Sequence, residues 1–194
     1  MFIETEDTPN PQSMKFLPGQ PILGAGVLGR DFPNAETAKA SPLALSLFDV
    51  DGVAGVFLGA DFVTVTKYDS VDWRHVKPAI LGAIADFLTA GLPVLAEDAP
   101  PPRKPATSLD DYEEEDREIV EQIIELIDTR VRPAVAADGG DIVFQHYEPR
   151  TGVVFLSLHG SCSGCPSSMM TLKAGIENML KHYMPEIVKV EAVE

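Results

Sequence analysis

A proline-rich stretch at residues 98–109 constrains the fold of this chain more than any other feature of its sequence. It begins Asp98-Ala-Pro-Pro-Pro-Arg-Lys-Pro and shows no apolar periodicity. Prolines at this density favour extended polyproline geometry, a semi-rigid spacer of about 3 Å per residue. In a chain of 194 residues, the stretch predicts two small domains, at 1–97 and 110–194, joined by a linker at 98–109.

The composition indicates a soluble globular protein and disfavours several classes of partner. Hydrophobic residues make up 45% and charged residues 23%, which is enough to close a core. The net charge of −15 repels phosphate backbones and anionic lipids, so we expect neither nucleic acid nor a membrane as partner. The first residues have neither the basic start nor the apolar segment of a signal peptide. We therefore expect a bacterial cytoplasmic protein or, if a presequence has been removed, a mitochondrial matrix protein.

The first domain is predicted to be an α+β unit with an antiparallel sheet. Ser41-Pro42 has the pattern of a helix N-cap followed by proline at the first helical position. Two β-rich runs separated by a short loop predict a hairpin. The expected elements are an extended segment at 1–17, a helix opened by Ser41-Pro42, a hairpin of 53–58 and 62–67, and a helix from about Trp73 that stops at Gly91.

The second domain is predicted to follow the order helix, strand, strand, helix, strand. Its first helix carries acidic residues in its first turns and arginines at its end, as the helix dipole favours. The expected elements are a helix at about 110–130 stopped by Pro133, strands at 141–147 and 153–159, a helix from Pro166 and a last strand at 187–193. Each domain is thus predicted to be an antiparallel sheet packed with helices, and the fold class is α+β.

The candidate metal-binding or reactive residues of the second domain lie in one short loop. The run Gly160-Ser-Cys-Ser-Gly-Cys-Pro166 places Cys162 and Cys165, the two cysteines of the chain, between a strand and a helix. Backbone N–H groups at a helix N-terminus favour the thiolate, which is the form that binds metal or attacks sulfur. Small residues beside the thiols leave room for a bulky inorganic group. Cys162 and Cys165 are therefore the candidate metal and cofactor ligands, and no catalytic residue is predicted.

Four interpretations of this pair are open on the residues alone. Zinc requires four ligands. The nearest histidine, His159, lies before the loop, and the chain has no second pair of zinc ligands elsewhere. A thiol-disulfide oxidoreductase, the alternative function, has this spacing, but here the proline follows the second cysteine. Two buried thiols acting as small apolar residues fit poorly in a turn rich in serine and glycine. An iron-sulfur cluster held by thiolates needs four of them, so two chains would have to share one cluster.

Other polar residues of the second domain have simpler interpretations. Asp138 and Asp141 flank Gly139-Gly140 and could form a metal or acid-base pair. The favoured interpretation is a turn that leads into the first strand. In this turn the glycines adopt unusual backbone angles and the aspartates cap backbone groups. His159 and His182 are expected to be structural and not iron ligands.

Three runs of the second half are specific in combination. They are Arg132-Pro133, Asp138-Gly-Gly-Asp-Ile142 and Gly160-Ser-Cys-Ser-Gly-Cys-Pro-Ser167, followed by Leu172 and Gly175-Ile-Glu177. Through them the C-terminal domain resembles the NifU-like domain of Nfu-type iron-sulfur proteins. The first domain is similar to the Nfu N-terminal domain through the runs at 8–16, 53–57 and 61–65.

This resemblance implies a non-enzymatic carrier or scaffold. Such a protein binds a 4Fe-4S cluster shared between the C-terminal domains of two copies and transfers it to apo-proteins during iron-sulfur protein maturation. Cys162 and Cys165 match the cluster cysteines of the family. The implied partners are a second copy of the chain, upstream cluster donors and apo-protein clients, which the cysteine-free N-terminal domain would help to recognise.

Overall fold

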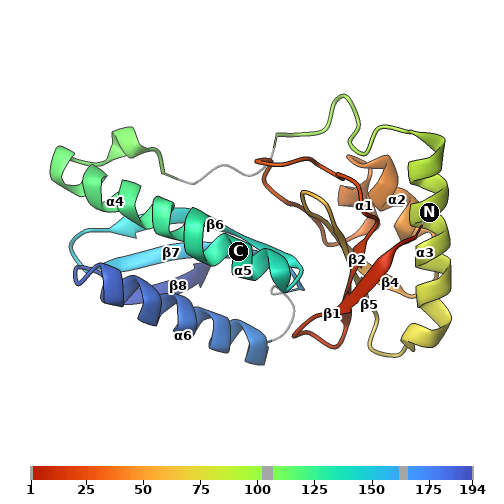
Figure 1. The fold of residues 1–194 in the computed structure, drawn as a ribbon. Helices are drawn as coiled ribbons and strands as arrows, with labels where there is room; N and C mark the ends of the chain where they lie inside the picture. The colour runs from red at the N-terminus through yellow and green to blue at the C-terminus, as the bar shows by residue number, and fades with distance from the viewer. Residues whose placement is uncertain (1, 102–106, 162–165, 194) are drawn as a thin grey trace.

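The computed structural model describes residues 2–101, 107–161 and 166–193. They form two regions, each a sheet packed with helices, that lie side by side (Figure 1). The predicted α+β fold class is confirmed. Within the described residues, no helix is both long and apolar enough to cross a membrane.

The N-terminal region is built on a five-stranded antiparallel sheet in the order β1-β2-β5-β4-β3. Its strands are β1 (Glu4–Asp7), β2 (Ser13–Leu17), β3 (Arg30–Phe32), β4 (Val53–Leu58) and β5 (Val63–Lys67). Its helices are α1 (Ala35–Ala38), α2 (Pro42–Phe48) and α3 (Trp73–Ala90). The predicted hairpin and the two longer helices are confirmed.

Local sequence signals fix the ends of these helices. The Ser41 hydroxyl accepts the N–H of Ala44 at 3.1 Å, with Pro42 in the first turn of α2. Gly91 ends α3 in the left-handed conformation, at φ 65°. Neither β3 nor α1 was predicted, because elements of three and four residues are too short to show a period.

One face of the N-terminal sheet packs on α2 and α3. Alternate strand residues such as Val56 and Val65 point to this face and are buried with Leu47 and Ile80 in a single hydrophobic core. Figure 1 shows α3 on the side of the sheet that lies away from the C-terminal region. The opposite face of the sheet therefore turns toward the C-terminal region.

The C-terminal region has a three-stranded sheet in the order β6-β7-β8, with its helices packed on the core-facing side. The strands are β6 (Gly140–Glu148), β7 (Val153–Gly160) and β8 (Lys189–Val193). The helical segments are η1 (Leu109–Asp111), α4 (Glu114–Leu126), the π-helical η2 (Ile127–Val131), α5 (Arg132–Ala137) and α6 (Pro166–Tyr183).

Two predictions for this region are wrong in detail. Pro133 does not stop the first helix, which continues through η2 and α5 to Ala137. Proline lacks an N–H group, and here it lies in the first turn of α5, directly after a wider π-helical turn. The sheet is not wholly antiparallel, because β8 pairs parallel to β7 while β6 and β7 are antiparallel. The intervening α6 provides the crossover that a parallel pair requires.

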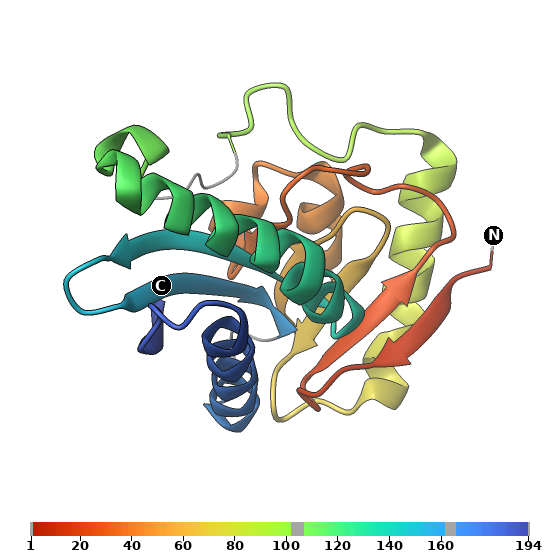
Figure 2. The same ribbon diagram turned by 60° about the vertical axis from the view of Figure 1, so that its left-hand side comes forward.

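The described residues between the two regions lie on the surface. Residues 91–101 run from the end of α3 back across the N-terminal region (Figure 2), where the N–H of Ala96 donates to the carbonyl of Ala40 at 3.0 Å. Residues 102–106 lie outside the described residues. Beyond them, the N–H of Thr107 donates to the carbonyl of Gln145 in β6 at 3.2 Å. The exact domain boundaries stay a prediction.

Candidate functional site

The candidate site is the connection between β7 and α6, which carries Cys162 and Cys165. Residues 162–165 lie outside the described residues, so the roles of both cysteines stay predictions. As predicted, α6 begins at Pro166, and β7 ends at Gly160. The site is therefore built here from the segments that flank the loop.

Helix α6 follows the second cysteine directly. It is 18 residues long, so its peptide dipoles place partial positive charge at the first turn. Lys181 and His182 in its last turn complement the negative end. The helix thus supplies at Pro166 the kind of field that favours a thiolate over a thiol.

On the other side of the loop, hydrogen bonds hold Ser161 to the turn that precedes β6. It is 1% exposed. Its N–H donates to the carbonyl of Gly139 at 3.3 Å, and its hydroxyl donates to the carbonyl of Asp138. These bonds tie the chain that enters the cysteine loop to the turn at residues 138–139.

The Asp138–Asp141 run is a structural turn, as predicted. Gly139 has φ 83°, a conformation that glycine adopts readily. The Asp141 carboxylate accepts the N–H of Ile142 at 2.7 Å and the Nε–H of Arg132 at 3.1 Å. Arg132 also donates to the carbonyl of Ile142 at 3.0 Å. Asp141 therefore caps the first residues of β6, and Arg132 fastens this turn to α5.

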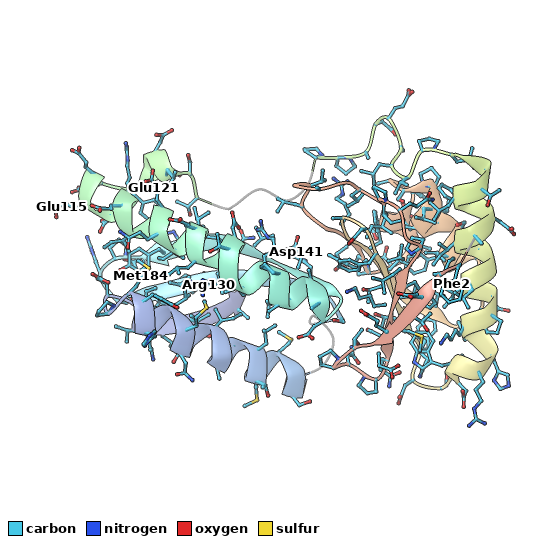
Figure 3. The ribbon with its side chains drawn as sticks, viewed as in Figure 1. Phe2, Glu115, Glu121, Arg130, Asp141 and Met184 are labelled. Atoms are coloured by element: carbon cyan, nitrogen blue, oxygen red, sulfur yellow. The ribbon has the colours of Figure 1, made fainter. Side chains whose placement is uncertain are left out.

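The Asp141 carboxylate also reaches the N-terminal region. Its Oδ2 atom accepts the N–H of Gly29 at 2.9 Å. Figure 3 shows Asp141 at the end of the C-terminal region that faces the N-terminal sheet. The sequence did not predict this contact, because nothing in the pattern around Gly29 indicates a distant partner.

The histidines named in the sequence have partners of ordinary structural kinds. His159 Nε2 lies 3.1 Å from Ser157 Oγ, and the ring of His182 packs edge-on against Tyr183 with centroids 5.1 Å apart. Among the residues that the structure describes, no group of three or more His, Cys, Asp or Glu side chains could hold a metal ion. The two cysteines stay the candidate ligands.

A groove of about 540 Å³ opens beside the loop, between α5 and α6. Most of its wall is apolar, and Asp138 and Ser167, which lie close to the two ends of the loop, also line it. Pro9 of the N-terminal region contributes as well. The lining residues are Pro9, Arg130, Val131, Ala134, Asp138, Ser167, Thr171, Leu172, Gly175, Ile176 and Met179. Both regions therefore shape the surface next to the site.

An ion-pair network fastens α6 to β8. Lys173 donates to Glu191 Oε2 at 2.6 Å, and Lys189 pairs with the same carboxylate. The hydrogen bonds from Lys173 and then Lys189 lower the pKa of Glu191 to about 2. On the same helix, Glu177 accepts from Lys181 and from the N–H of Val190, and these bonds lower its pKa as well. The helix that follows the loop is thus anchored to the sheet electrostatically.

Two family models match the chain and together cover most of it. The model described as "Scaffold protein Nfu/NifU N terminal" matches residues 3–91. The model described as "NifU-like domain" matches residues 123–191. The second match includes the cysteine loop and both of its flanks.

Curated relatives match over the whole chain. The chain is 53% identical over 193 residues to a Drosophila sechellia protein named "NFU1 iron-sulfur cluster scaffold homolog, mitochondrial", covering 100% of this chain and 65% of the relative. It is 49% identical over 191 residues to "NifU-like protein 4, mitochondrial" of Arabidopsis thaliana, covering 98% of this chain and 65% of the relative. The chain thus spans just under two thirds of the length of these relatives.

Among solved structures, the solution structure of a NifU-like protein from Saccharomyces cerevisiae is similar to part of the chain. The two are 29% identical, the TM-score is 0.46, and the match covers 50% of this chain and 87% of that one.

Proposed function

The chain belongs to the Nfu/NifU family of scaffold proteins, and we propose from this premise that it carries a 4Fe-4S cluster between the C-terminal domains of two copies and passes it to apo-proteins. The observation that supports the proposal most strongly is the cysteine loop itself. It has two thiols in a short run of serine and glycine, and it lies within a matched NifU-like domain.

The number of thiols requires a second copy of the chain. A cluster held by thiolates takes four of them, and each chain has two. Two loops, one from each chain, complete the set. Because the cluster lies at a junction between subunits, separation of the subunits exposes it, and such a cluster is suited to delivery as cargo.

The residues that flank the loop support this role. The N-terminus of α6 favours the charged form of a thiol close to it, so metal binding requires less deprotonation work. Ser161, held against Asp138 and Gly139, fixes the entrance of the loop. Among the described residues, no group of three or more His, Cys, Asp or Glu side chains competes with the two cysteines for a metal ion.

The names of the relatives support a proposal for partners and location. A scaffold requires a donor that supplies the cluster and clients that receive it, and both classes of protein are proposed as partners. The two relatives cited above are named mitochondrial. They give no support to the expected bacterial cytoplasmic location, and we place the protein in the mitochondrial matrix.

Anaerobic reconstitution of the full chain with ferrous iron and sulfide tests the proposal. We expect about two irons per chain, absorption near 400 nm and the mass of a dimer. Cys162→Ser and Cys165→Ser should each abolish iron uptake and leave a monomer. Ser46→Ala, which removes a hydroxyl remote from the loop that donates to the carbonyl of Leu43, serves as the control and should load as the unaltered chain does.

Two other results would overturn the proposal. A colourless monomer that cycles between dithiol and disulfide would indicate a thiol-disulfide oxidoreductase. Uptake of iron that survives both cysteine substitutions would place the metal elsewhere. If reconstitution succeeds, the transfer of iron and sulfide to an apo-ferredoxin, followed by the return of its visible spectrum, tests delivery.

A further inference from the structure

The face of the N-terminal sheet that turns away from α2 and α3 carries a continuous row of side chains. The strand register aligns one residue from each of the five strands: Glu6, Lys15, Thr64, Phe57 and Asp31. We call these five residues the cross-strand row. Its three central members are 7%, 1% and 2% exposed, although no helix of their own domain covers them.

The C-terminal domain covers the centre of this row. The part that meets it is the open end of the β6–β7 ladder, where Gly140 pairs with Gly160 and Asp141 pairs with His159. One strand of this ladder end leads directly into Ser161 and the cysteine loop. The row therefore lies against the base of the candidate site.

Two members of the row donate to backbone carbonyls at the end of α5 and in the turn before β6. The Thr64 hydroxyl donates to the carbonyl of Gly139 at 2.7 Å, and both atoms are buried. Lys15 Nζ donates to the carbonyl of Ala137 at 3.4 Å and also pairs with Glu6. Because buried carbonyl groups need a donor, these contacts hold the turn in place against the sheet.

Phe57 provides the apolar part of the contact. It is 2% exposed, yet it belongs to neither of the two hydrophobic cores. Its ring lies over Gly160, where an added Cβ would come within 3.0 Å of Phe57 Cγ. An added Cβ at Gly139 would likewise lie 2.8 Å from Thr64 Oγ1. At these two glycines with positive φ, the row thus approaches the backbone of the C-terminal domain too closely to admit an added Cβ without a shift.

Asn10 adds a contact from the loop between β1 and β2. Its side chain is buried, and Nδ2 donates to the carbonyl of Ser161 at 3.3 Å. Its Oδ1 atom accepts the N–H of Gln12 at 3.0 Å, within its own loop. Ser161, the residue before Cys162, is therefore held from the C-terminal domain by Asp138 and Gly139 and from the N-terminal domain by Asn10.

From these contacts we infer that the N-terminal domain positions the cysteine loop of its own chain. Thr64, Phe57 and Asn10 are positioning residues: they fix the turn at 138–140 and the segment 160–161 from which the loop departs. The inference rests on the proposed function, because it assigns the positioned thiols to a cluster. It gives the N-terminal domain a role at the site in addition to recognition of partners.

Isosteric substitutions in β5 provide a matched test. Thr64→Val removes the hydroxyl that crosses to Gly139, whereas Thr66→Val removes a hydroxyl on the same face that bonds Ser13 Oγ at 2.8 Å within the N-terminal domain. Thr64→Ser restores the donor. Asn10→Asp keeps the acceptor for Gln12 but loses the donor to Ser161. All four variants are made in the full chain.

The first readout is cluster lifetime in the presence of a chelator. Residues that support metal ligands typically change affinity by about tenfold or more, and we expect about tenfold faster loss of the 400 nm absorption in Thr64→Val and Asn10→Asp. Thr66→Val and Thr64→Ser should lose the cluster at the rate of the unaltered chain. Equal rates for Thr64→Val and Thr66→Val would overturn the inference.

The second readout needs no cluster. In the reduced apo-protein, the amide of Ser161 should exchange hydrogen faster in Thr64→Val and Asn10→Asp, and iodoacetamide should modify Cys162 and Cys165 at an altered rate. The thermal midpoint of the N-terminal domain should stay the same. If the unaltered chain binds no cluster, the proposed function fails, while exchange and alkylation still decide whether these residues position the loop. Exchange and alkylation unchanged in both variants would contradict positioning.

Discussion

The two domains contain the same kinds of element but use the two faces of their sheets differently. In the N-terminal domain, helices cover one face and the second face carries the cross-strand row. In the C-terminal domain, helices also cover one face, but the candidate site lies at the end of the strands, where β6 begins and β7 leads into the cysteine loop. The N-terminal sheet thus presents a face to its neighbour, whereas the C-terminal sheet carries the cysteine loop at the end of β7.

This difference indicates a division of labour between the domains. The domain without cysteines presents a row of side chains with a buried centre, and the domain with cysteines meets this row with a turn that contains glycines. Side chains of its own domain hold this turn, and side chains of the neighbouring domain also donate to backbone carbonyls in it and beside it. The following substitutions separate effects at the junction from effects within each domain.

The largest effect is expected at Gly160. An added Cβ would lie 2.7 Å from the carbonyl oxygen of Gly139 and 2.8 Å from Gly140 Cα, and φ is 76°. Gly160→Ala should lower the free energy of unfolding by roughly 2–5 kcal/mol, since backbone strain adds to overpacking. Urea denaturation followed by circular dichroism measures the loss, and fluorescence of Trp73, the single tryptophan, reports the N-terminal domain.

Gly175→Ala is the control for this substitution. Gly175 lies in α6 with no atom within 4 Å of an added Cβ. Alanine there should raise the free energy of unfolding by roughly 0.5–1 kcal/mol, because it favours the helix. Equal losses at the two positions would mean that the ladder end is not the tightly packed part of the C-terminal domain.

A smaller effect is expected when the charge at the junction is removed. Asp141→Asn keeps the shape but turns an amide toward the donors of Arg132, Ile142 and Gly29. We expect a loss of about 1–3 kcal/mol in unfolding free energy, with both domains affected because the carboxylate contacts both. Asp86→Asn, on the exposed face of α3, should change stability by less than about 0.5 kcal/mol. A loss confined to the C-terminal domain would show that the bond to Gly29 contributes nothing.

A substitution within the N-terminal domain should leave its neighbour unchanged. Ser41 caps α2 by accepting the N–H of Ala44, and its hydroxyl donates to the carbonyl of Val94 at 2.6 Å. Ser41→Ala should lower the unfolding free energy of this domain by about 1 kcal/mol. The change should appear in the Trp73 fluorescence transition and not in hydrogen exchange within α6. Faster exchange in α6 would show that the two domains unfold together.

The smallest effect is expected at the ion pair between α6 and β8, and it should depend on pH. The folded pKa of Glu191, about 2, lies below the ordinary value of 4.5. The carboxylate therefore stabilises the fold above pH 4.5, and this stabilisation is lost as the pH falls toward 2. Glu191→Gln should lower stability by less than about 1 kcal/mol at pH 7, because the pair is partly exposed to solvent.

Urea denaturation at a series of pH values checks this expectation. The difference between the unaltered chain and Glu191→Gln should shrink between pH 5 and pH 2. A difference that grows on acidification would mean that the carboxylate is not held in its charged form by Lys173 and Lys189.

The sequence predicts those elements whose residues repeat over several turns or lie beside a strong local signal. Helix α3, the hairpin of β4 and β5, and the start of α6 at Pro166 belong to this class. The continuation of the helix past Pro133 does not, because proline is an ordinary stop signal and a π-helical turn has no sequence signature of its own. The parallel pairing of β8 depends on where α6 delivers the chain, which the strand pattern does not contain.

The sequence predicts only the parts of the site that have a local signal, and not those that depend on the position of the other domain. Cysteine spacing identifies the loop, and the Asp138–Asp141 run indicates a turn. The alternation of β5 shows that Thr64 lies opposite the core, but a residue on that face reads as exposed to solvent unless the position of the other domain is known. Asn10 lies in the segment 1–17, which is predicted to be extended, so the sequence predicts neither the turn between β1 and β2 nor the distant carbonyl that Asn10 contacts.

The contacts of the cross-strand row also have an order in time. Thr64 and Gly139 are 75 positions apart, and Asn10 and Ser161 are 151 positions apart. During synthesis a domain generally folds as a unit, and the N-terminal one does so first. The strands that carry the row end at Lys67, so the row can be complete while the ribosome is still translating the residues that it will contact. The thiols are thus synthesised well after the residues of the row, at a time when the N-terminal domain can already be folded.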